Sequence, residues 1–169
     1  MKNKLGFTLL ELLVVVLVIG ILAAIALPQY KFAVAKSKYA TLKNITKSLK
    51  ESVDRYYLAT GEYPTKYGDL DIDLNINNEW DYKNVSFYIF FPGVDSCEIY
   101  YKNNTTIWCK KIILGTLMTY SDHAYPTNKR VCLAYSSNTS DVPNRVCQSE
   151  TGKTAEQGQC QSSYCSYNY

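Results

Sequence analysis

One carboxylate stands inside an otherwise apolar stretch near the start of the chain. Glu11 is the only charged residue in the 21-residue run from Phe7 to Leu27. A carboxylate at the centre of a bilayer costs about 2.5–3.5 kcal/mol, and less near an end of the spanning segment. The chemistry open to such a residue is charge pairing. We therefore expect Glu11 either to meet a cation or to extend toward the lipid headgroups.

A second reactive set is formed by six cysteines in the C-terminal half of the chain. Their even number and clustering favour disulfides and an oxidising compartment. A zinc site would need paired Cys or Cys/His spacing, and the one histidine, His123, lies far from any Cys doublet. The sequence predicts no metal site. The disulfide candidates are Cys97, Cys109, Cys132, Cys147, Cys160 and Cys165.

The remaining residues do not predict catalysis. The chain has no nucleophile-elbow glycine pattern and no phosphate-binding loop, and we interpret His123 as a solvated loop residue. Eighteen basic and fifteen acidic residues give a formal charge of +3, which predicts no polyanionic partner and leaves nucleic-acid binding undecided. We expect neither an enzyme nor a cofactor.

The apolar run is long enough to cross a membrane, because 21 residues at ~1.5 Å per residue span a hydrocarbon core of ~30 Å. Three fates compete for it. Ala24-Ile25-Ala26 resembles a signal-peptidase site, and cleavage after Ala26 would release a secreted, disulfide-bonded binding domain. A plain uncleaved anchor would give Glu11 no role.

The third fate follows from a resemblance. Gly6-Phe7-Thr8-Leu9-Leu10-Glu11-Leu12, preceded by Lys2 and Lys4, resembles the class III leader junction of type IV prepilins and type II secretion pseudopilins. The resemblance implies that a membrane prepilin peptidase cuts after Gly6 and methylates the new N-terminus at Phe7.

Cleavage there would place the amine of Phe7 four residues before Glu11, and helical residues four apart share a face. The resemblance implies that Glu11 meets the N-terminus of a neighbouring subunit during assembly. It also implies, as partners, other copies in a polymer, the peptidase, an inner-membrane assembly platform, and membrane lipid before assembly.

After residue 27 the apolar pattern narrows to one helical stripe, which predicts an amphipathic helix packed on a sheet. Gly20 and Pro28 stand where family members often carry Gly and Pro, and the resemblance implies bending there. Thr60-Gly61 is a plausible stop, so the helix should run from Phe7 to about Ala59. The stripe consists of Tyr30, Val34, Leu42, Ile45, Leu49, Val53 and Tyr56.

The segment that follows alternates polar and apolar residues from Asp69 to Asn77. Gly61-Glu62-Tyr63-Pro64 before it resembles the loop that follows the long helix in many pseudopilins. The alternation predicts an extended segment with Leu70, Ile72, Leu74 and Ile76 turned inward. An EF-hand calcium loop does not fit, because it needs Gly at its sixth position, and a looser calcium site near Asp69–Asp73 stays open.

Strands are predicted at residues 85–91, 97–101, 105–113 and 130–135. A three-residue loop, Lys102-Asn103-Asn104, would place Cys97 opposite Cys109 and Ile99 opposite Ile107. Cys132 could then pair with Cys147, and Cys160 with Cys165. The nested pairs Cys132 with Cys165 and Cys147 with Cys160 stay open, since six cysteines allow fifteen pairings.

The sequence thus predicts an α+β pilin fold, in which a long N-terminal helix, membrane-spanning in its first half, packs on a disulfide-bonded antiparallel sheet. The expected divisions are a leader at 1–6, a spanning helix at 7–27, an amphipathic helix at 28–59 and a head at 60–169. The expected function is a pilus subunit, and the alternative is a periplasmic pseudopilus subunit. In both, the head lies outside the cytoplasm.

Overall fold

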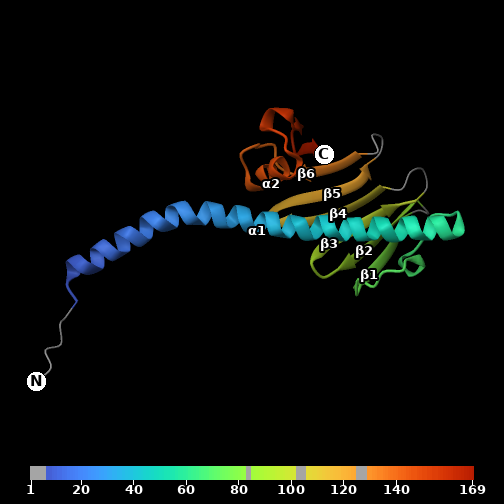
Figure 1. The fold of residues 1–169 in the computed structure, drawn as a ribbon, viewed down its shortest axis with the longest axis horizontal. Coiled ribbons are helices and arrows are strands. Elements are labelled where there is room, and N and C mark those ends of the chain that lie inside the picture. The colour runs from blue at the N-terminus through green and yellow to red at the C-terminus, as the bar shows by residue number, and fades with distance from the viewer. Residues whose placement is uncertain (1–6, 83–84, 102–105, 125–128) are drawn as a thin grey trace, which may run out of the picture.

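The structure is a computed structural model that describes residues 7–82, 85–101, 106–124 and 129–169. It confirms the predicted fold class, a long helix packed on an antiparallel sheet (Figure 1). The helices are α1 (Leu9–Thr60) and α2 (Val142–Thr151), with 3₁₀ turns at Tyr67–Asp69 and Ala155–Gln157. The strands are β1 (Asn78–Tyr82), β2 (Ser86–Phe91), β3 (Val94–Tyr100), β4 (Thr106–Ile113), β5 (Thr116–Ala124), β6 (Lys129–Ala134), β7 (Gln159–Cys160) and β8 (Cys165–Asn168).

Local signals define both ends of α1. Thr8 caps the first turn, and Gly61 ends the last turn in the left-handed region at φ 77°, where its N–H donates to the carbonyl of Tyr57 over 2.8 Å. The helix runs without a break through Gly20 and Pro28. Pro28 has no amide hydrogen to donate to the preceding turn, which favours bending. Figure 1 shows α1 bent in its blue N-terminal part.

The strands form one sheet in the order β1-β2-β3-β4-β5-β6-β8-β7, and every pair in it is antiparallel. The β3–β4 register places Cys97 opposite Cys109 and Ile99 opposite Ile107, as the sequence predicted. The residues of the expected connecting loop, 102–104, lie outside the described ranges. His123 lies in β5, so its assignment to a loop was wrong.

The core lies between the C-terminal part of α1 and one face of the sheet. Leu42, Leu49 and Val53 of the predicted stripe are fully buried there. Tyr30 is 68% exposed and was wrongly included, because α1 reaches the sheet only after that residue. The sequence reading also missed four buried helix positions, which are Ala35, Tyr39, Thr46 and Ser52.

The segment between α1 and β1 packs as predicted. Leu70 is buried, and Ile72, Leu74 and Ile76 contact the core while the residues between them face solvent. This alternation positions the acidic side chains of the segment outside, beside the distal end of α1 (Figure 1).

Candidate assembly site

The first turn of α1 holds Glu11 in a reciprocal cap. The Glu11 carboxylate accepts hydrogen bonds from the Thr8 amide at 2.9 Å and the Thr8 hydroxyl at 2.8 Å, and the Glu11 amide donates to the Thr8 hydroxyl oxygen at 3.2 Å. This capping box satisfies amides that a helix start otherwise leaves without partners. Phe7 precedes it and is 75% exposed, whereas Gly6 lies outside the described residues. The structure therefore brings Phe7 and Glu11 to the same exposed helix end.

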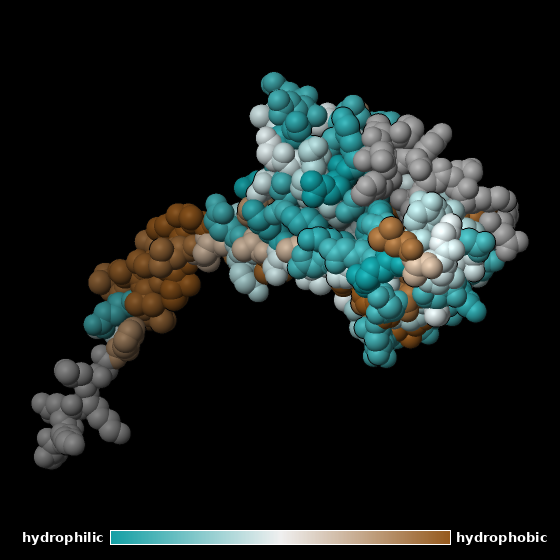
Figure 2. All heavy atoms as spheres, turned by 45° about the vertical axis from the view of Figure 1, so that its right-hand side comes forward, coloured by the Kyte–Doolittle hydropathy of each residue, from teal (hydrophilic) through white to brown (hydrophobic). Residues whose placement is uncertain are grey.

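The first third of α1 is an apolar rod that leaves the head. It is the one helix among the described residues that is long and apolar enough to cross a membrane, and none of its most apolar window is buried. Figure 2 shows this brown rod projecting from a mostly teal and white head. An apolar surface of this extent requires lipid or other protein to cover it. The exposed side chains include Leu9, Leu13, Val16, Leu17, Ile21, Leu22, Ile25 and Leu27.

Three disulfides hold the head, and they join neighbours in sequence. Cys97–Cys109 links β3 to β4, Cys132–Cys147 links β6 to α2, and Cys160–Cys165 links β7 to β8. Of the two pairings that the sequence left open for the last four cysteines, the structure has the sequential one. The C-terminal region is thereby attached to the edge of the sheet.

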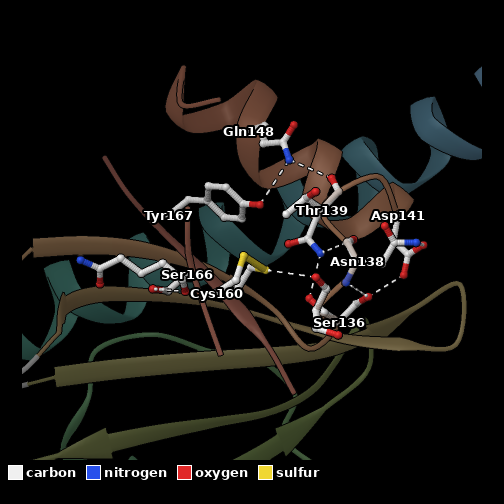
Figure 3. The surroundings of a disulfide bond; sticks show 12 residues. Ser136, Asn138, Thr139, Asp141, Gln148, Cys160, Ser166 and Tyr167 are labelled. Atoms are coloured by element: carbon white, nitrogen blue, oxygen red, sulfur yellow. Dashed lines mark hydrogen bonds between the residues drawn. A yellow bond between two sulfur atoms is a disulfide. The ribbon is translucent and has the colours of Figure 1, made fainter. Parts of the chain in front are cut away.

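A polar network orders the loop between β6 and α2 (Figure 3). Asp141 accepts from the Ser136 hydroxyl at 2.5 Å and from the Asn138 amide at 2.9 Å. The buried Asn144 side chain donates to the carbonyls of Ser136 and Asn138 at 2.9 and 2.8 Å. Gln148 donates to the Thr139 carbonyl at 2.9 Å. These bonds fix the loop as a preformed surface, because each links it to α2.

Glu150 connects α2 to α1. Its carboxylate lies 2.6 Å from Nζ of Lys43 and 3.5 Å from Nζ of Lys36. Burial alone would raise the pKa of Glu150, but the hydrogen bond and charge of Lys43 outweigh it, and the pKa is lowered. Burial opposes the charged form of Lys43 too, and the bond to Glu150 nevertheless raises the pKa of Lys43. The pair is ionised and anchors the C-terminal region to the long helix.

The last residue of the chain docks beside this pair. The Tyr169 ring contacts Tyr120 edge-on at 5.7 Å between centroids, and its hydroxyl lies 3.5 Å from that of Tyr39. Lys43 Nζ and Arg130 Cζ lie over the ring at 5.8 and 5.6 Å. Burial raises the pKa of the Tyr39 hydroxyl, so this cluster stays neutral. Sequence reasoning missed it, because its members lie up to 130 residues apart.

The acidic segment after α1 uses its carboxylates internally. Asp71 accepts from Arg55 at 2.6 and 2.7 Å and from the Ser52 hydroxyl at 2.5 Å, and the Arg55 bonds hold the pKa of Asp71 far below its usual range. Asp69 accepts from backbone amides of residues 65 and 66, and Asp73 from that of residue 75. Within the described ranges, no group of three or more acidic, Cys or His side chains is arranged to hold a metal ion.

Known proteins match the chain in both its N-terminal segment and its full length. The family model described as the prokaryotic N-terminal methylation motif matches residues 1–27. The fimbrial protein EcpC of Eikenella corrodens is 40% identical over 75 residues, 44% of this chain and 49% of the relative. A type IV major pilin protein PilE1 of Neisseria gonorrhoeae is 41% identical over 59 residues, 35% of this chain and 36% of the relative.

These two matches span about half or less of each relative. A fimbrial protein of Moraxella nonliquefaciens is 31% identical over 163 residues, which cover 86% of this chain and 94% of the relative. A match of that extent includes the head as well as the helix. With the methylation motif, the long helix and the disulfide-bonded sheet, it establishes that the chain belongs to the type IV pilin family.

Proposed function

We propose that the chain is a structural subunit of a type IV pilus-like filament. The observation that carries the proposal is the apolar first third of α1, which projects fully exposed from a folded head. In the monomer only lipid can cover this surface, and in a polymer the same segments of other copies can cover it. Residues 7–27 would therefore serve first as a membrane anchor and then as the filament core.

The N-terminal residues would control the change between these two states. In this proposal the prepilin peptidase cuts between Gly6 and Phe7 and methylates Phe7, and Glu11 meets the amine of a neighbouring copy. The methylation motif in residues 1–27 supports the processing step. The position of Phe7 and Glu11 at one exposed helix end supports the pairing step. Bending at Gly20 and Pro28 would adapt α1 to its neighbours.

The head would lie outside the cytoplasm, first on the inner membrane and then on the filament. Its three disulfides support an oxidising location. An inner-membrane assembly platform would extract the processed subunit from lipid. The filament would be a surface pilus, and a pseudopilus confined to the periplasm is the alternative within the same family.

Mass spectrometry of filaments sheared from the cell surface tests the proposal. We expect the intact chain in that fraction, beginning at N-methylated Phe7 and carrying no free thiol. A mature chain that begins at Leu27 would indicate a secreted domain and would overturn the proposal. A correctly processed chain found only in periplasmic filaments would indicate the pseudopilus instead.

A further inference from the structure

Charges of opposite sign occupy different levels along the chain. Residues 12–50 contain six lysines and no acid, so their formal charge is +6. Residues 51–81 contain eight acids and two bases, so their formal charge is −6. The basic region is the middle of α1, and the acidic region is the distal end of α1 with the segment beside it (Figure 1). The two regions carry equal and opposite charge.

Many of these charges pair within the subunit, and the exceptions define two contact surfaces. Lys43 pairs with Glu150, Lys47 with Glu51, and Arg55 with Asp71. In contrast, Lys31 and Lys38 are exposed and form no ion pair within the described part of the chain.

Glu62 is the acidic counterpart. It follows the end of α1 and is exposed, and its carboxylate forms no ion pair with any described residue. We name the Lys31 and Lys38 side the basic surface and the Glu62 side the acidic surface.

We propose that the basic surface of one subunit binds the acidic surface of a second copy in the filament. This inference rests on the proposed function. Copies packed in parallel must be shifted along the axis for the two surfaces to meet. Lys38 and Glu62 are 24 residues apart, which corresponds to about 36 Å at ~1.5 Å per residue.

The N-terminal contact fixes the size of each step. A copy that brings Phe7 beside Glu11 of its neighbour is shifted by four residues, or about 6 Å. The charge contact therefore joins copies that are several steps apart. It adds a bond between the heads of the polymer to the apolar contacts of the core, and its complementarity sets the register of the copies.

Charge reversal with exchange tests this contact. Lys38→Glu and Glu62→Lys should each reduce the sheared filament per cell at least about tenfold, since each places like charges opposite one another. The double variant should recover most of the yield. Exposed residues outside both surfaces provide the controls, and Lys153→Glu and Glu156→Lys should leave the yield unchanged. Wild-type filaments should also shed subunits more readily at high salt.

The outcomes separate this inference from the proposed function. If wild-type chains assemble and both reversals assemble equally well, the charge contact is absent although the subunit function holds. If Lys38→Glu loses filaments and Glu62→Lys neither weakens assembly nor restores it in the double variant, the lysines serve the anionic lipid surface instead. If the wild-type chain forms no polymer, the proposed function itself fails.

Discussion

Lys43 of α1 and Glu150 of α2 form the ion pair that joins the long helix to the C-terminal region, with 2.6 Å between Nζ and Oε2. The two residues are 107 positions apart, and the Glu150 side chain is only 13% exposed. A carboxylate this deeply buried is stabilised by its partner rather than by water. The pair thus couples the docking of the C-terminal region to the helix that carries the assembly site.

We predict that Glu150→Gln lowers the free energy of unfolding by about 1–3 kcal/mol at neutral pH, because Lys43 loses a charged acceptor. The folded-state pKa of Glu150 lies below its ordinary value of 4.5, so its contribution is present above that pH and is lost as the pH falls. Denaturant melts of the head should show wild type and variant converging below about pH 4. Lys47→Gln, which removes a more exposed pair 3.8 Å long, is the matched control and should cost less.

The disulfides should differ in what they contribute. Cys132–Cys147 closes a loop with a sequence separation of 15, and Cys160–Cys165 closes one of 5. In the chain-entropy model the larger loop contributes about 3 kcal/mol and the smaller one less. Replacing Cys132 and Cys147 together by Ser should lower the melting temperature more than the same change at Cys160 and Cys165. Equal losses would show that local packing, and not loop closure, determines the effect.

Gly158 marks a close approach that tolerates no side chain. A Cβ at this position would lie 2.5 Å from Cε1 and 2.8 Å from Cζ of Tyr167, whose ring is fully buried. Gly158→Ala should therefore destabilise the head by about 1–3 kcal/mol in a chemical melt, through overpacking. Gly68→Ala is the control, since a Cβ there meets nothing within 4 Å, and it should be nearly neutral.

Features set by local sequence were predictable, and features set by distant contacts were not. The capping residue Thr8 and the terminating Gly61 mark the limits of α1, and the Cys97–Cys109 register follows from short-range hairpin geometry. Helix α2 was missed, because ten residues that begin at Val142-Pro143 carry little pattern and rely on a disulfide and an ion pair for their position. Strand β1 was missed because it is exposed along its whole length and lacks apolar alternation.

The candidate site divides in the same way. The role of Glu11 rests on local spacing and a family motif, so it could be predicted from the sequence. The Tyr169 cluster and the network of the loop before α2 are built from residues distant in sequence or from backbone carbonyls. Neither leaves a periodic signal that a sequence reading could detect.

Leader removal offers a direct test at the junction. Gly6→Val should leave the precursor uncut, because a branched side chain at the cleavage position would clash with the peptidase. The precursor would then run above the mature chain on a denaturing gel and form no filaments. A variant of unchanged mobility would contradict cleavage after Gly6. Leu5→Val makes a similar change one residue earlier and should still be processed.

The charge of Glu11 can be separated from its capping function. Glu11→Ala removes both, and we expect normal insertion and leader cleavage with at least about tenfold fewer filaments. Glu11→Gln keeps an oxygen that can accept from Thr8 but loses the charge, whereas Thr8→Val removes the capping hydroxyl and keeps the charge. Loss of the cap alone costs about 1 kcal/mol of helix stability, which an embedded helix of 52 residues tolerates.

Filament yield from these three variants therefore distinguishes two roles for the same carboxylate. If Glu11 pairs with the amine of a neighbouring subunit, Glu11→Gln should fail as Glu11→Ala does, and Thr8→Val should assemble. If Glu11 serves only to cap α1, Thr8→Val should fail and Glu11→Gln should assemble. A carboxylate in an apolar rod is stabilised more by an opposite charge than by a neutral donor, because hydrogen bonds between charged groups are roughly twice as strong as neutral ones. We expect the first pattern.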